Sequence, residues 1–232
     1  QLSQIRPGYV RALKTYLSVL ESRNALLRQD KLQGVSDFAN QLDAWDEQLA
    51  NAAVPIVRSR RWFLRELSEN SSRESAAISE NPDEPFSLFY VGPLAQSDAP
   101  YEQMLAGLRR NREEDRRRMY TTFGPHRDDV SLQLFGRDLR AMGSQGQLRT
   151  AVLSRKLGEI RLIEKEMGES PTLLLDDVFS ELDAKRRNAL FKSAAPLQTF
   201  ITCTDRQDAA GARADCFLRV TPTPDGTVLS RE

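Results

Sequence analysis

The amino-acid sequence predicts a mixed protein in which a mainly helical region, residues 1–118, precedes an α/β region with a layered sheet, residues 119–232. Two observations support this division. Up to about residue 70, apolar residues recur at steps of three and four, which is the period of an amphipathic helix. After about residue 120, short apolar runs alternate with helical stretches, as in a sheet covered by helices.

The helical region begins with two amphipathic helices that Gly34 separates. The apolar positions of the first helix are Tyr9, Leu13, Tyr16, Leu17 and Leu20, and those of the second are Val35, Phe38, Leu42, Trp45 and Leu49. The pattern continues through Trp62, Phe63 and Leu67 into a polar stretch, residues 69–85, which we interpret as a loop or a weak helix end. FSLFYVGPL, residues 86–94, predicts a short strand, and residues 101–119 predict an arginine-rich helix.

The α/β region begins with alternation at Val130, Leu132 and Leu134 before a turn at Gly136, which predicts a strand. A long helix is expected from Gln145 to Met167, stopped by Gly168 and Pro171. TLLL, residues 172–175, and QTFITCT, residues 198–204, predict two buried strands. Asp183 is a plausible N-cap for a helix over residues 184–194, and CFLRV and GTVLS, residues 216–220 and 226–230, predict edge strands.

Composition leaves the partners of the chain open. The 33 basic and 33 acidic residues balance, so net charge alone does not indicate nucleic acid. Of the basic residues 27 are arginine, whose planar guanidinium suits phosphates. The run RRNREEDRRR, residues 109–118, could therefore contact DNA, or its interleaved acids could make it a salt-bridged helix face.

Several classes of protein are disfavoured. No run of about 18 apolar residues is present and the first residues do not resemble a signal peptide, so we expect a soluble, cytoplasmic protein with no membrane partner. Cys203 and Cys216 form no CxxC pair, and we interpret them as reduced core residues. With His126 as the single histidine, a zinc site or a Ser-His-Asp triad lacks the necessary residues.

Two motifs carry chemistry. PTLLLDDVFSELD, residues 171–183, is an apolar strand that ends in two adjacent acids, Asp176 and Asp177; nucleotide hydrolases use such acids to hold Mg²⁺ and to orient water, although aspartates after strands also cap helices. GSQGQLR, residues 143–149, immediately precedes the long helix. Its glycines would permit close approach of a ligand, and the first amides of the helix could bind an anion. The same residues are also typical of a simple helix cap.

In this order and spacing the two motifs resemble the signature loop and Walker B strand of ABC-type ATPases, with SELD, residues 180–183, at the place of the D-loop. The run from TTFGPHRDDVSLQL through FITCTD resembles the C-terminal part of the RecF family of SMC-like DNA-repair ATPases. PGYVRALKTYLSVLESRNALLRQ and LDAWDEQLANAAVPIVRSRR resemble its helical second lobe. The resemblance implies an α/β ABC-type ATPase head, of which residues 119–232 are the C-terminal half, after lobe II at residues 1–118.

The resemblance also implies roles for the acids. Asp176 falls on the Walker B acid that holds Mg²⁺, and Asp177 on the general base, where most ABC ATPases carry glutamate. Most of these enzymes have a histidine after the next strand, and this chain has Thr204 at about that place. His126 lies instead in GPHRDD, residues 124–129, for which a buried hydrogen-bond network and a contact to nucleotide or DNA are equally plausible.

The signature positions are implied to act on a second subunit. Ser144, Gly146 and Gln147 fall on the residues that close over the γ-phosphate of ATP bound to the opposite subunit. Asp183 falls on the D-loop aspartate at the same interface. The catalytic unit is therefore expected to be a homodimer that forms on ATP.

The function implied by the resemblance is that of a weak Mg²⁺-dependent ATPase that binds double-stranded DNA at single-strand gaps and assists RecA loading with RecO and RecR, in DNA replication, recombination, repair and the SOS response. The chain contains no GxxxxGK[ST] and so lacks the Walker A region, and alone it is expected to be inactive. The alternatives are a non-catalytic module that binds DNA or RecR, and an SMC-like ATPase of the overcoming-lysogenisation or double-strand-break type. The latter typically have a long coiled coil that about 110 residues cannot supply.

Overall fold

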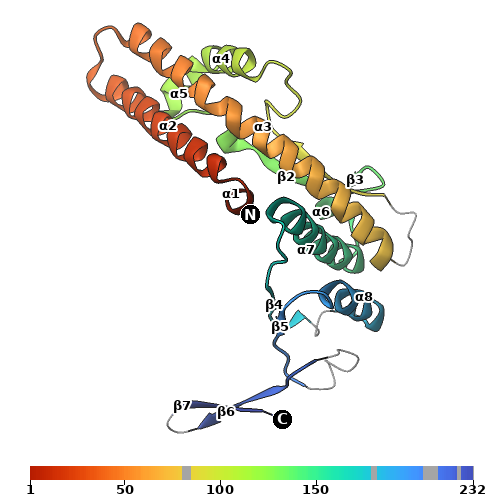
Figure 1. Cartoon of the computed structure of the whole chain (residues 1–232). Coiled ribbons are helices and arrows are strands. Elements are labelled where there is room, and N and C mark those ends of the chain that lie inside the picture. The colour runs from red at the N-terminus through yellow and green to blue at the C-terminus, as the bar shows by residue number, and fades with distance from the viewer. Residues whose placement is uncertain (80–84, 179–181, 206–213, 224–225, 232) are drawn as a thin grey trace. The chain divides into compact units, whose positions relative to one another are not determined.

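The computed structural model describes residues 1–79, 85–178, 182–205, 214–223 and 226–231 (Figure 1). The chain divides into two compact units, Gln1–Glu169 and Ser170–Glu232, and each is considered by itself. The first unit combines long helices with an antiparallel sheet, and the second combines a helix with short strands. The fold is thus mixed α/β and mostly helical, whereas the lobe boundary after residue 118 stays a prediction.

Two long helices form the frame of the first unit (Figure 1). After the short α1 (Leu2–Ile5), α2 (Pro7–Gln33) begins at a proline and ends at Gly34, whose φ of 71° favours glycine. The predicted break at Gly34 is confirmed. The next helix, α3 (Phe38–Ile78), runs on through most of the stretch that we interpreted as a loop or a weak helix end.

The extension of α3 has a packing reason. Leu67, Ser71, Ser75 and Ile78 are buried and follow one another at steps of four, four and three, so they form one stripe on the inner face of the helix. Serine is small enough to lie in such a stripe where another element approaches closely. The polar composition of residues 69–78 therefore reflects close packing and not the end of a helix.

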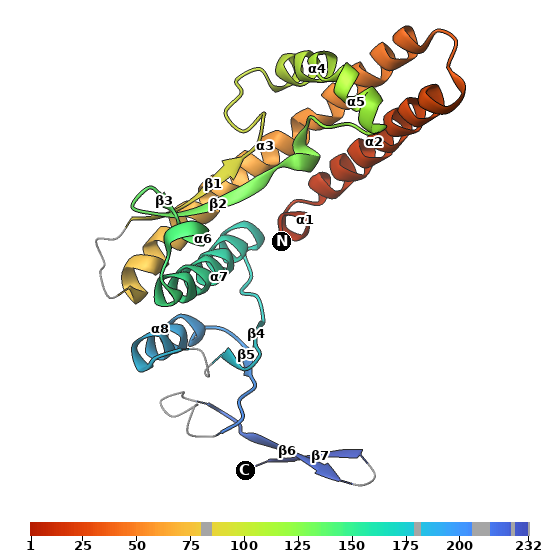
Figure 2. The same ribbon diagram turned by 180° about the vertical axis from the view of Figure 1, so that it is seen from behind.

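An antiparallel sheet lies along α3 (Figure 2). β1 (Phe86–Val91) pairs with β2 (Asp129–Leu134) so that Phe86 faces Leu134, and β3 (Arg137–Asp138) extends the sheet after a turn at Gly136. Between β1 and β2 the chain forms α4 (Pro100–Arg110), α5 (Arg112–Arg118) and the short 3₁₀ helix η1 (Pro125–Arg127). These elements confirm the predicted strands and the arginine-rich helical segment.

The long helix α7 (Gln145–Met167) follows the short α6 (Leu139–Met142) and has the predicted bounds. It packs on α3, and Gly158 lies directly against Ser71 of that helix. A Cβ atom built on Gly158 would lie 2.6 Å from the backbone nitrogen and 2.8 Å from the Cα of Ser71. Such distances are too short for real atoms, so this helix contact requires glycine at position 158.

In the second unit β4 (Leu173–Leu175) and β5 (Thr199–Ile201) pair in parallel, with α8 (Ala184–Ala194) between them in the chain. β6 (Leu218–Thr223) and β7 (Gly226–Arg231) pair with each other in an antiparallel hairpin. The strands are where the sequence predicts them, but the predicted burial of β4 and β5 is wrong. Leu174 and Phe200 are opposite each other in the ladder and are 74% and 56% exposed, because no described residue covers the face that they share.

The interpretation of the cysteines as core residues is also wrong. Cys203 and Cys216 are exposed, and no disulfide joins them. Cys203 lies in the segment after β5 and Cys216 in the segment before β6, so neither side chain belongs to a packed element. Among the described residues, no helix is both long enough and apolar enough to cross a membrane.

Replacing Gly158 by alanine should lower the free energy of unfolding of the first unit by about 1–3 kcal/mol, because α7 and α3 must move apart. Gly8→Ala is the matched control: Gly8 also lies in a helix, and a Cβ there meets nothing within 4 Å. The control should be unchanged or slightly more stable. Urea unfolding followed by circular dichroism measures both, and a Gly158→Ala variant as stable as the Gly8→Ala variant contradicts the close contact.

Candidate functional site

The turn before α7, residues 143–149, is organised as a capping box. The Ser144 hydroxyl accepts a hydrogen bond from the backbone N–H of Gln147 at 3.2 Å, and the Gln147 side-chain oxygen accepts one from the backbone N–H of Ser144 at 3.0 Å. Gly146 lies between them in the first turn. The predicted helix cap is confirmed. The cap also fixes the first amides of a 23-residue helix, whose N-terminus favours an anion.

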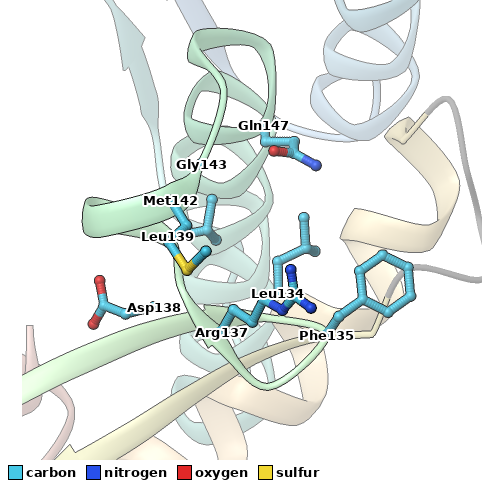
Figure 3. Close-up of a pocket in the computed structure, with 8 residues that line it drawn as sticks. All are labelled: Leu134, Phe135, Arg137, Asp138, Leu139, Met142, Gly143 and Gln147. Carbon is cyan, nitrogen blue, oxygen red and sulfur yellow. The ribbon is translucent and has the colours of Figure 1, made fainter.

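A cavity of about 480 Å³ lies beside this turn (Figure 3). Gln147 and Gly143 lie on one side of it and Arg137 and Phe135 on the other. The end of β2, β3, α6 and the start of α7 supply its lining, which consists of Leu134, Phe135, Arg137, Asp138, Leu139, Met142, Gly143 and Gln147. The turn therefore borders a recess and not a flat surface, and the walls of the recess combine a guanidinium, an amide and apolar side chains. The sequence did not predict this cavity.

The two acids, Asp176 and Asp177, directly follow β4 at the carboxyl end of a parallel strand, and both are exposed. Thr202 lies next to them because it directly follows β5. Its backbone N–H donates to the Leu175 carbonyl at 2.9 Å. Its hydroxyl donates to Asp176 Oδ1 at 2.6 Å and accepts from the backbone N–H of Asp177 at 3.0 Å. The sequence analysis did not single out Thr202, and its placement of Thr204 at about the position of the usual histidine stays a prediction.

Asp183 is the N-cap of α8, as predicted. Its carboxylate accepts a hydrogen bond from the backbone N–H of Arg186 at 2.9 Å and forms an ion pair with the guanidinium of the same residue. The backbone N–H of Arg186 and the nearby positive charge hold the pKa of Asp183 below its usual value. Residues 180 and 181 of the predicted D-loop lie outside the described residues, and the interface role of Asp183 stays a prediction.

The donors at the end of β4 fit Mg²⁺ in kind. Carboxylate oxygens and a hydroxyl are hard ligands, and Mg²⁺ is usually bound by one or two carboxylates while substrate phosphates and water supply the other ligands. Within the described part of the chain, no group of three or more His, Cys, Asp or Glu side chains could hold a metal ion. Asp176 and Asp177 thus offer oxygen donors of the kind that Mg²⁺ takes, and whether either one binds the metal stays a prediction.

His126 and Asp128 of GPHRDD take part in a partly buried hydrogen-bond network, in line with the first of the two predicted alternatives. His126 Nδ1 lies 2.6 Å from the Tyr16 hydroxyl and His126 Nε2 lies 3.0 Å from the Thr121 carbonyl. Since a carbonyl only accepts, Nε2 carries a proton, and in the neutral imidazole Nδ1 then accepts from the tyrosine hydroxyl. Burial lowers the pKa of His126 below its usual value of 6.5, in agreement with this arrangement.

Asp128 provides a second set of contacts that hold the GPHRDD segment in place. The Arg60 guanidinium donates to Asp128 Oδ2 at 2.7 Å, and the Tyr90 hydroxyl donates to the same oxygen. A Cβ on Gly92 would lie 2.1 Å from the other carboxylate oxygen, so only glycine leaves room there. Burial raises the pKa of Asp128. The motif is thus bound to α3 and β1 by hydrogen bonds and ion pairs within the protein.

Sequence reasoning missed a residue of the helical unit, Arg23. Its side chain is fully buried, and its guanidinium pairs with Asp46 at 2.7 Å and with Asp115 at 2.8 Å. Its place in the sequence carried a signal, because it lies three residues after Leu20 and four before Leu27 and so continues the apolar stripe of α2.

The arginine run is a salt-bridged face, which was the second predicted alternative. Arg112 pairs with Asp46 at 2.6 Å, and Arg116 with Asp30 at 2.6 Å. Arg117 pairs with Glu114 at 2.5 Å, and Arg118 pairs with the same carboxylate. Because these guanidiniums pair with acids of the first unit, the arginine run by itself does not indicate that the chain binds DNA phosphates.

The strand that ends in paired carboxylates and the long helix that begins at a Gly-Ser turn are the two features in which the sequence resembles an ABC-type ATPase head. The chain is 42% identical over 209 residues to the DNA replication and repair protein RecF of Herpetosiphon aurantiacus, with 89% of this chain and 54% of the relative covered. It is 36% identical over 228 residues to the RecF of Lachnoclostridium phytofermentans, with 98% and 61% covered. The chain therefore belongs to the RecF family of DNA replication and repair proteins.

A solved structure of the recombination mediator protein RecF-ATP in the RecFOR pathway agrees with this assignment. The two structures match with a TM-score of 0.86 at 32% sequence identity, over 100% of this chain and 60% of that chain. No family model matches the chain. The chain spans little more than half the length of the relatives that it matches.

The single histidine makes the buried network testable by pH. Because the His126 pKa is below 6.5 in the folded state, the unfolded chain binds a proton between these two values that the folded chain does not. The free energy of unfolding should therefore fall as the pH decreases through this window. Urea unfolding at about pH 7.5 and about pH 5.5 measures the change, and a His126→Gln variant should lose this part of it.

An NMR titration of the imidazole provides an independent measurement, since the chain has no other histidine. A titration midpoint at or above 6.5 would contradict the buried neutral imidazole. Tyr16→Phe removes the hydroxyl that donates to Nδ1 and should destabilise the unit by about 1 kcal/mol.

Proposed function

We propose that this chain supplies one face of a composite ATP site in a RecF-type protein that dimerises on ATP in the cytoplasm. The observation that carries the proposal is the arrangement of the two acids with Thr202 at the carboxyl edge of parallel strands β4 and β5. This edge is where open α/β sheets bind ligands. Its hard oxygen donors suit Mg²⁺ and its exposed position leaves room for phosphates.

The two acids have different tasks in this proposal. Asp176, whose Oδ1 accepts from Thr202, contributes a carboxylate to the Mg²⁺ shell. Bound Mg²⁺ would neutralise charge on the β- and γ-phosphates. Asp177 orients the attacking water and accepts its proton. Its short side chain and fixed backbone set the position of that carboxylate.

The turn before α7 has the complementary task toward the second subunit. The Ser144 hydroxyl and the amides of Gly146 and Gln147 lie at a helix N-terminus, where an anion such as a γ-phosphate is favoured. The adjoining cavity gives the turn a concave surface. Asp183 contributes at the same interface. ATP then controls dimer formation because its γ-phosphate is shared between the two subunits.

The biological part of the proposal rests on family membership. A RecF-type dimer of this kind binds double-stranded DNA at single-strand gaps and assists RecA loading together with RecO and RecR. Family membership favours this reading over the other SMC-like ATPases considered from the sequence. A non-catalytic DNA- or RecR-binding module remains the alternative to be tested, and the loss of turnover in the variants below distinguishes it.

In a protein of full RecF length that carries these residues, Asp177→Asn should keep nucleotide binding and the ATP-induced dimer but lower kcat by about 10²–10⁴-fold, since only proton transfer is lost. Asp176→Asn should weaken Mg²⁺-dependent ATP binding by about tenfold or more. Asp98→Asn, an exposed acid in the first unit, is the control and should change neither. Equal binding, dimerisation and turnover in the two test variants would show that the roles are wrong.

Action across the subunit boundary can be tested by mixing. Ser144→Arg should leave ATP binding to each monomer near normal but prevent dimer formation, because a bulky cation occupies the place of the γ-phosphate. A subunit with this change is mixed with one that lacks the P-loop lysine of the full-length protein. Their dimer has one intact composite site and one doubly broken site, so part of the ATP turnover should return.

A matched control for the mixture uses Val152→Ala, a change at an exposed position of α7 beyond residues 143–149, in place of Ser144→Arg. The control variant should form ATP-induced dimers with unsubstituted subunits, as the unsubstituted protein does. If mixed dimers form with Ser144→Arg and no turnover returns, the site does not act across the boundary.

A further inference from the structure

One hydroxyl connects the two acids at the end of β4. Thr202 Oγ1 donates its hydrogen to Asp176 Oδ1 at 2.6 Å and accepts the backbone N–H of Asp177 at 3.0 Å. A threonine hydroxyl has a single hydrogen, so the donation to Asp176 and the acceptance from Asp177 use different parts of the group and occur together. The hydroxyl therefore fixes a carboxylate orientation and a backbone position at once.

The backbone of Asp177 is unusual and needs such support. Its φ is 45°, in the left-handed region that residues other than glycine rarely adopt. Residues in this conformation persist where the surroundings hold them. The Thr202 hydroxyl is one group that does so, and it is itself held because the Thr202 backbone N–H bonds to the Leu175 carbonyl at 2.9 Å.

We propose that Thr202 is a positioning residue for the ATP site: it turns the Asp176 carboxylate toward the metal position and holds the Asp177 backbone so that its carboxylate faces the water. This inference rests on the proposed function for its consequence in turnover, but the positioning itself is a property of the second unit. Serine can do the same through its hydroxyl. Valine keeps the shape of threonine and can do neither.

Three variants test the role. Thr202→Val removes the hydroxyl and keeps the β-branched shape that suits a strand end. Thr202→Ser keeps the hydroxyl. Thr204→Val is the matched control, since Thr204 is also an exposed threonine after β5 and lies two residues away.

The first measurement is hydrogen exchange of the Asp177 amide in this chain, read by NMR. Thr202→Val should accelerate this exchange by about two- to tenfold, the range expected from loss of one hydrogen bond, while Thr202→Ser and Thr204→Val leave it near the original rate. Binding of Mn²⁺ alone, followed by EPR, should weaken in the valine variant at position 202 and recover with serine. Unchanged exchange in Thr202→Val, or acceleration that serine does not reverse, overturns the proposal.

The second measurement is ATP turnover in the protein of full RecF length. Thr202→Val should lower kcat by about tenfold or more with KM nearly unchanged, and Thr202→Ser should restore kcat. If the unsubstituted protein shows no turnover but the exchange and Mn²⁺ results are as expected, the proposed ATP hydrolysis fails and the positioning role stands. If turnover is present and Thr202→Val leaves it unchanged, the positioning role fails and the proposed function stands.

Discussion

The fully buried guanidinium of Arg23 is the interaction on which the first unit depends. Removing a charged group from water costs free energy, and here the carboxylates of Asp46 and Asp115 pair with the buried guanidinium. Arg112 forms a further ion pair with Asp46, so two positive charges face two negative charges. Loss of one such partner costs about 3–5 kcal/mol in comparable pairs, because the remaining charge stays buried. These contacts tie α2, α3 and α5 into one unit.

A series of polar contacts continues from Arg23 toward the turn at Ser144. Thr121, which accepts from Arg23 at 2.8 Å, places its carbonyl against His126, and His126 holds Tyr16. Asp128 continues the chain of contacts through Arg60. Residues 121–128 are thereby fixed where β2 begins, and β2 leads through β3 and α6 to the turn at Ser144. The position of that turn is thus set by polar contacts far from it in the sequence.

Periodicity and turn residues predicted the elements well. The long helix from Gln145 to Met167, the break at Gly34 and the strand positions all follow from local patterns. Burial was harder to predict than secondary structure. Leu174 is apolar but exposed, because the residue type alone does not show whether another layer covers the strand. The serines of α3 were wrongly interpreted as a sign of a loop or a weak helix end. They are polar but buried, because their small size allows another helix to pack closely against α3.

The candidate site was predictable to a similar degree. Motif order gave Asp176 and Asp177 and the cap at Ser144, because these are features of one segment each. Thr202 was missed because it lies 25 residues after Asp177, and its role depends on the register between two parallel strands, which follows from the whole crossover. The engagement of the arginine run also depended on distant acids.

The left-handed backbone of Asp177 has a consequence for the identity of the acid itself. Among residues other than glycine, aspartate and asparagine adopt this conformation most readily, because their short polar side chains bond locally. Glutamate, with its longer side chain, lacks that advantage. The backbone geometry at position 177 therefore favours the shorter carboxylate.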